Sequence, residues 1–245
     1  GRGATADERS PTVADNSAEN EFLVAWEDGR NGLDIYGRRV SAAGKATGPD
    51  FRISGGAAQE VWPALAYNPA DNEYLVAWMD DRAGAWDVYG RRLEGSGSTI
   101  GADFRICGPG ATGNEYKPKA AFNTSTDEYL VVWADERNLA GRLQDVYGRR
   151  VSTAGAVVAG DFRVSGPGAV SHDLQPVVAY DSTTGHFLVA WADKRNYGLH
   201  GYDIYAKEFS ATGTAIGGDF RVSGPQATAD EELPAVTYNP AAANY

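Results

Sequence analysis

The sequence repeats itself four times, and this repetition limits the folds open to the chain more than any other feature. The segment EFLVAWEDGR at 21–30 returns as EYLVAWMDDR at 73–82, EYLVVWADER at 128–137 and HFLVAWADKR at 186–195. Its tryptophans are Trp26, Trp78, Trp133 and Trp191, at spacings of 52, 55 and 58 residues. A period near this length is typical of arrays in which each supersecondary unit stacks on the next.

Three further blocks recur with the same period. One is DIYGRRV at 34–40, which returns at 87–93, 145–151 and, more loosely, 203–209. Another is DFRIS at 50–54, which returns at 103–107, 161–165 and 219–223. The block that opens each unit begins with a proline: Pro11, Pro63, Pro118, Pro176 and Pro234. The repeats therefore run over about 11–62, 63–117, 118–175 and 176–233, with a partial fifth at 234–245.

Each block has the pattern of a β-strand. The first two blocks are short, rich in aromatic and β-branched residues, and separated by turn-forming residues such as NPADN at 68–72, which predicts a hairpin. No segment has the apolar spacing of a long helix. Four strands per unit predict an all-β protein, a β-propeller of four-stranded antiparallel blades in one domain spanning 1–245. The repeated tryptophan is then expected to fill the space between neighbouring blades.

The run VAWEDGRNGLDIYGRRVSAAG at 24–44 resembles the repeat of TolB-type and other WD-like propellers. In that family an apolar strand ends in Asp and Arg, a Gly-containing turn follows, and the next strand begins Asp-Ile-Tyr. The resemblance covers nearly the whole chain and implies a propeller that serves as a docking surface, a peptidase gate or a surface module. The turns NPADN, NTSTD and DSTTG replace the family's usual Ser-Pro-Asp-Gly, which marks a divergent branch.

An Asp-x-Arg motif ends the tryptophan block in every repeat. A carboxylate beside a tight turn accepts backbone N–H groups, and we expect the arginine to reach the aspartate that opens the next strand. Because the motif recurs in all units, we interpret it as structural. Its residues are Asp28, Asp80, Asp135 and Asp193 with Arg30, Arg82, Arg137 and Arg195.

Composition excludes several classes of protein. The chain has 33 acidic and 22 basic residues, a net charge of -11, which argues against nucleic acid or an anionic membrane as the partner. No apolar run approaches the roughly 20 residues that span a bilayer. The single cysteine, Cys107, stands where other repeats have serine. The three histidines lack metal-ligand spacing. No metal and no cofactor are expected.

The loop between the second and third blocks varies most, and we predict that it carries a binding face for a protein or a glycan. It holds three, four, seven and seven residues in successive repeats. Length variation on one face of a repeat array often marks its binding surface. The apolar residues expected at these loop tips are Trp86, Leu139, Leu143, Tyr197, Leu199 and Tyr202.

Two functions remain open from the sequence. The first is a non-catalytic propeller, exported to the periplasm or the extracellular space, that binds a protein or glycan and can be a subunit of a larger assembly. The alternative is a carbohydrate-active, glycosidase-like propeller with carboxylates at the central channel. Asp15 is a candidate for such a carboxylate, because the equivalent residues of the other repeats are all aromatic. Unlike carboxylates converging on the channel would favour the enzyme, and repeat-equivalent residues would favour the binder.

Overall fold

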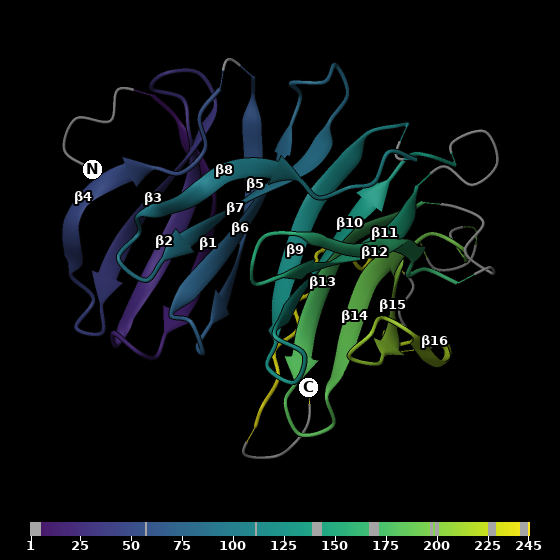
Figure 1. Ribbon diagram of the computed structural model, residues 1–245. Coiled ribbons are helices and arrows are strands. Elements are labelled where there is room, and N and C mark those ends of the chain that lie inside the picture. The colour runs from purple at the N-terminus through teal and green to yellow at the C-terminus, as the bar shows by residue number, and fades with distance from the viewer. Residues whose placement is uncertain are drawn as a thin grey trace.

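The computed structural model describes residues 6–56, 58–110, 112–138, 144–166, 172–196, 198, 201–224, 229–240 and 245. These residues form sixteen strands in four antiparallel sheets, each a simple meander of four consecutive strands (Figure 1). The expected all-β class and the four complete propeller blades are confirmed. Across the described ranges, no helix is long and apolar enough to cross a membrane.

The strands follow the repeat blocks closely. The first blade holds β1 (Glu8–Asn16), β2 (Glu21–Asp28), β3 (Asp34–Ser41) and β4 (Ala46–Arg52). The second holds β5 (Glu60–Asn68), β6 (Glu73–Asp80), β7 (Asp87–Glu94) and β8 (Thr99–Arg105). The third holds β9 (Glu115–Asn123), β10 (Glu128–Asp135), β11 (Asp145–Ser152) and β12 (Val157–Arg163). The fourth holds β13 (Asp173–Asp181), β14 (His186–Asp193), β15 (Asp203–Phe209) and β16 (Ala215–Arg221).

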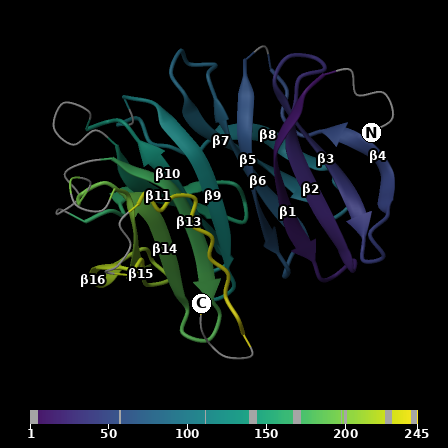
Figure 2. The same cartoon turned by 180° about the vertical axis from the view of Figure 1, so that it is seen from behind.

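The blades stack side by side, and their inner strands lie next to one another. β5 contacts both β1 and β9, and β9 also contacts β13. Residues 229–240, which include the start of the expected fifth repeat, form no strand but run beside β13 (Figure 2). There the backbone N–H of Leu233 donates to Gln175 Oε1 at 2.8 Å. The first strands of four blades and this segment therefore surround one axis.

Three of the four repeat tryptophans pack into the seam with the preceding blade. Trp78 lies with Leu23 and Ile53 of the first blade in one apolar cluster, and Trp133 and Trp191 occupy the next two seams in the same way. All three of these side chains are fully buried. Trp26 is only half-buried, because no blade precedes the first one among the described residues.

The glycine of the Asp-Ile-Tyr-Gly block is needed for a close approach. A Cβ on Gly90 would lie 2.7 Å from Ile106 Cδ1, which follows the outer strand of the same blade and is fully buried. The fourth blade has Ala206 at the equivalent position, and the residue that matches Ile106 there is Val222, which is 56% exposed. Ala206 is itself fully buried, and its methyl group fits there because the exposed Val222 does not pack inward as Ile106 does.

Candidate functional site

A pocket of about 350 Å³ lies on the axis between the inner strands. This volume is at the small end of the range, roughly 300–1,000 Å³, of small-ligand pockets. Equivalent stretches of successive repeats build its wall: Thr12, Trp62–Leu65, Lys117–Ala120, Gln175–Val178 and Leu233–Val236. Of these lining residues, none is acidic.

A bulge recurs before each repeat proline, and in four of the five units its residue lines the axial pocket: Trp62, Lys117, Gln175 and Leu233. The residue before the repeat proline has a positive φ in every unit, with values of 49° at Ser10, 55° at Trp62, 51° at Lys117, 54° at Gln175 and 57° at Leu233. This conformation is uncommon for residues other than glycine, and the strand pairing shifts register at the bulge in each of the four blades. The backbone is therefore repeated, whereas the side chain at this position differs in every unit.

Two of the bulge side chains, Lys117 and Trp62, contact each other. Lys117 Nζ lies 4.8 Å from the centre of the Trp62 ring, a cation–π distance. The Trp62 side chain is 42% exposed. The backbone N–H of Trp62 donates to Glu27 Oε1 at 2.8 Å, and that of Lys117 to Met79 Sδ at 3.2 Å. Glu27 is buried and is the acidic member of a position that is methionine or alanine in the other blades.

A side cavity of about 220 Å³ adjoins the axial pocket and shares Lys117 and Gln175 with it. Its wall also includes Gln144 and Tyr116. Behind it lies Glu136, whose carboxylate accepts hydrogen bonds from Asn114 Nδ2 at 2.8 Å and Gln144 Nε2 at 3.0 Å. Burial, followed by the charge of Glu136, raises the pKa of Tyr116. A second carboxylate thus binds a residue in the wall of the side cavity.

The repeated Asp-x-Arg motifs form ion pairs at the strand ends rather than a site. Arg82 Nε donates to Asp80 Oδ1 at 2.8 Å and Arg82 Nη2 to Asp103 Oδ2 at 2.6 Å, while its guanidinium lies 4.2 Å from the Tyr89 ring centre. The expected bond from this arginine to Asp87 is not formed, because Arg105 binds Asp87 instead. The indole N–H of Trp78 also donates a hydrogen bond to Asp80 Oδ2, at 3.2 Å.

Sequence reasoning missed a buried acid at the start of three of the four inner strands, β5, β9 and β13; the equivalent Glu8 of β1 is exposed. Glu60, Glu115 and Asp173 are essentially unexposed, and each pairs in register with the aspartate of the Asp-x-Arg motif. Burial, reinforced by neighbouring carboxylates, raises the pKa of Glu60 to about 7 and raises the pKa values of Glu115 and Asp173 as well. An acid three residues before every repeat proline was the signal available in the sequence.

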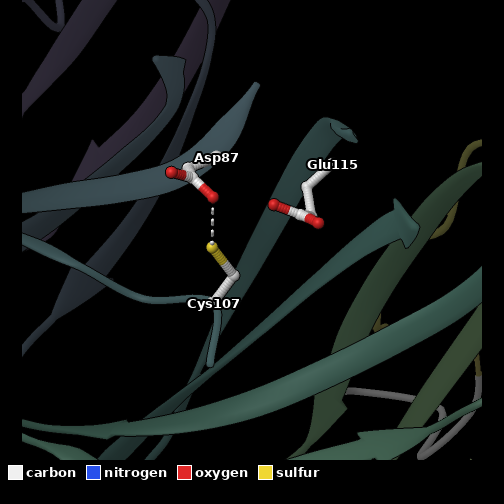
Figure 3. Close-up of side chains that lie close together, drawn as sticks. All are labelled: Asp87, Cys107 and Glu115. Atoms are coloured by element: carbon white, nitrogen blue, oxygen red, sulfur yellow. Dashed lines mark hydrogen bonds between the residues drawn. The ribbon is translucent and has the colours of Figure 1, made fainter. Parts of the chain in front are cut away.

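One junction brings Asp87, Cys107 and Glu115 together (Figure 3). Both oxygens of Glu115 lack a hydrogen-bond partner among the described residues. Arg105 Nε donates to Cys107 Sγ at 3.2 Å, and the same guanidinium binds Asp87, so the cluster already holds a positive charge. The Val88 N–H donates to Cys107 Sγ at 3.4 Å, as the Ile35 N–H donates to Ser54 Oγ at 2.8 Å in the preceding blade. These donors fit a hydrogen-bonded junction better than a metal centre.

Two of the predicted loop residues, Trp86 and Tyr202, lie in the described part of the chain. Both are half-buried, and their carbonyl groups accept the backbone N–H of Glu115 at 2.7 Å and of Glu231 at 2.9 Å. Lys194 Nζ lies 5.6 Å from the Tyr202 ring centre. Asp15 is exposed on β1, in register with Phe22. The other predicted loop residues lie outside the described residues: Leu139, Leu143, Tyr197 and Leu199.

No family model and no curated protein matches the sequence. Among solved structures, the chain is similar to the Hadza microbial sialidase Hz136, with a TM-score of 0.64 at 11% identity over 84% of this chain and 45% of that one. It is also similar to an α-L-arabinanase from Penicillium chrysogenum complexed with arabinobiose. That match has a TM-score of 0.64 at 13% identity and covers 90% of this chain and 68% of the arabinanase. A third similar structure is a GH43 endo-arabinanase from Bacillus licheniformis, with a TM-score of 0.53 at 13% identity over 86% of this chain and 77% of that one. The chain thus spans less than half the length of the sialidase and about 70% of the others.

These similarities correct two expectations. The named enzymes among these solved structures are arabinanases, arabinofuranosidases and a sialidase, so the TolB-type resemblance is wrong. The expectation of a non-catalytic binding module is contradicted as well, because these neighbours are enzymes that act on glycans. The misleading signal was the Asp-Arg and Asp-Ile-Tyr pattern, which records how a blade is held together and not what the propeller does. At these identities the likeness shows the fold alone.

Proposed function

We propose that this chain is a carbohydrate-active, glycosidase-like propeller that holds a glycan in the axial pocket. One observation carries the proposal: the residue at the axial bulge differs in every repeat, although its backbone conformation is the same. Structural positions of this protein repeat their side chains, as the tryptophan and Asp-x-Arg positions do. Four of the five bulge residues line the pocket, so we interpret their variation as fitting a ligand rather than as packing.

The chemistry of the wall suits a sugar. The partly exposed Trp62 ring offers a flat apolar face, and Gln175 and Lys117 offer polar groups beside it. A pocket that is mainly apolar with a few placed polar groups is the usual design for a small ligand. The volume of about 350 Å³ is sufficient for one sugar unit of a chain that enters along the axis.

We assign Glu27 and Glu136 as the candidate hydrolytic carboxylates. Glycoside hydrolysis commonly uses two carboxyl groups, one that protonates the leaving oxygen and one that acts as base or nucleophile. Glu27 binds the backbone of a pocket residue, Trp62, and Glu136 binds Gln144 in the wall of the adjoining cavity. Glu27 has no acidic equivalent in the other blades, whereas Glu136 corresponds to Asp81 of the second blade. Both carboxylates lie behind residues of the two cavity walls and not in the lining of the axial pocket itself.

The test combines binding with product release. Arabino-oligosaccharides, sialyllactose and oligogalacturonides would be titrated by calorimetry and then incubated while reducing ends are counted. We expect binding of at least one glycan, loss of binding in Trp62→Ala, and loss of product release with binding retained in Glu27→Gln. Glu94→Gln, an exposed acid at the end of β7, is the matched control. Absence of binding to every glycan class would overturn the proposal. An exported location stays part of it, because polymeric glycans lie outside the cell membrane.

A further inference from the structure

The two charged residues that line the axial pocket are both lysines, Lys117 and Lys119, in a protein whose net charge is -11. Both lie on β9, the third inner strand, at pocket-lining positions where the other repeats have different residues. The equivalents of Lys117 are serine, tryptophan, glutamine and leucine, and those of Lys119 are threonine, alanine, valine and alanine. The pocket is therefore positive, the opposite of the molecule as a whole.

Neither lysine is neutralised by the protein within the described residues. Many arginines of the described residues pair with carboxylates, as Arg82 does with Asp80, whereas no salt bridge involves either axial lysine there. Burial, and next the charge of Lys117, lowers the pKa of Lys119, and no carboxylate acts against this. The nearby acids are already engaged, Glu27 by the Trp62 backbone and Glu136 by Asn114 and Gln144.

Lys119 is exposed and Lys117 is half-buried, so both ammonium groups stay accessible from the pocket that they line. A ligand that brings a negative charge into this pocket supplies the counter-charge that its lining residues lack. The rest of the protein is acidic and repels anions, whereas this positive pocket attracts them. The pocket therefore favours anionic ligands over neutral ones. The charge of the wall therefore restricts the class of ligand.

We propose that the sugar held on the axis is acidic, a carboxylate-bearing unit of the uronic acid type, with its carboxylate at Lys117 and Lys119 and its ring against Trp62. This inference rests on the proposed function. Lys117 Nζ lies 4.8 Å from the centre of the Trp62 ring, so an ammonium and an aromatic face are presented together. A bare anion would use only the lysines and leave the exposed Trp62 ring uncovered.

The experiment compares an oligogalacturonate with its fully methyl-esterified form, since esterification removes only the charge. We expect the acid to bind about tenfold more tightly or better, a difference of about 1.4 kcal/mol, with affinity falling as salt rises. Lys119→Gln and Lys117→Gln should each weaken binding of the acid about tenfold and leave the ester unchanged. Lys45→Gln, at an exposed turn, is the control, and thermal unfolding checks that each variant folds.

Each other outcome has a definite meaning. Equal binding of acid and ester, or acid binding that does not depend on the two lysines, overturns this inference while the proposed function stands. Displacement of the acid by inorganic phosphate at equal concentration also overturns it, because the pocket would then bind an anion and not an acidic sugar. If neutral arabino-oligosaccharides and acidic glycans all fail to bind, the proposed function itself is lost, and this inference with it.

Discussion

Lys117 and Trp62 occupy the same position in successive blades, and the ammonium of one lies 4.8 Å from the ring centre of the other. The contact exists because both residues precede a repeat proline and share a positive φ, which directs each side chain toward the axis. Repeat-equivalent positions become spatial neighbours in a closed array of inner strands, so one site is assembled from residues about one repeat apart.

A ligand in the axial pocket should change the fluorescence of Trp62. Its ring is 42% exposed, so covering it should shift its emission to shorter wavelength. The variant Trp62→Phe keeps the other five tryptophans and should lose this response. A shift that persists in the variant would show that the ligand lies elsewhere.

The seam tryptophans should contribute unequally to stability. Trp78→Ala should lower the free energy of unfolding by roughly 3–5 kcal/mol, because the residue is fully buried between two blades. Trp26→Ala should lower the free energy of unfolding by clearly less, since this side chain is only half-buried. Chemical denaturation of the two variants measures the difference, and equal losses would contradict the seam assignment.

Replacing an arginine should lower the free energy of unfolding most where its partner carboxylate is buried. Arg82→Ala leaves Asp80, which is unexposed, without its bidentate partner, and losing one member of a buried pair costs about 3–5 kcal/mol. The exposed pair of Arg9 with Asp7 offers the comparison, and Arg9→Ala should cost less than about 1 kcal/mol. A similar loss in both variants, measured by denaturation, would argue against this distinction.

Glu60 should make stability depend on pH. Burial raises its pKa from 4.5 to about 7 in the folded state, so the folded protein holds this proton more tightly than the unfolded chain. Stability contributed by the protonated acid is present below pH 4.5 and is lost as the pH rises toward 7, by up to about 1.4 kcal/mol per pH unit. Glu60→Gln should flatten this part of the profile. An unchanged slope between pH 4.5 and 7 in the variant would refute the assignment.

Cys107 should behave as a substitute serine. Its thiol is buried, and burial raises its pKa, so labelling by a thiol reagent should be slow in the native protein and fast after unfolding. Cys107→Ser reproduces the residue of the other junctions and should change the free energy of unfolding by less than about 1 kcal/mol. Rapid native labelling, or a large loss in the variant, would indicate a role beyond packing.

The blades were predictable from sequence because strand formation and seam filling are local properties repeated four times. The alternation of apolar residues gave the strands, and the recurring Trp78-type residue gave the filler between sheets. Acids such as Glu60 also recur, three residues before each proline, but they lie outside the apolar blocks, so strand periodicity does not mark them as buried. Apolar residues at the loops, such as Trp86, drew attention to a face where the structure uses their backbone to join blades.

Only the tertiary structure decided where the candidate site lies. In the sequence, Trp62, Lys117 and Gln175 are three unlike residues about one repeat apart, and their differences look like loss of the pattern. The bulge before each proline and the closing of inner strands around an axis turn these differences into one wall. Local periodicity determines strands and blades, because each needs only its neighbours. A pocket on the axis depends on the convergence of all the inner strands, which no single stretch of sequence encodes.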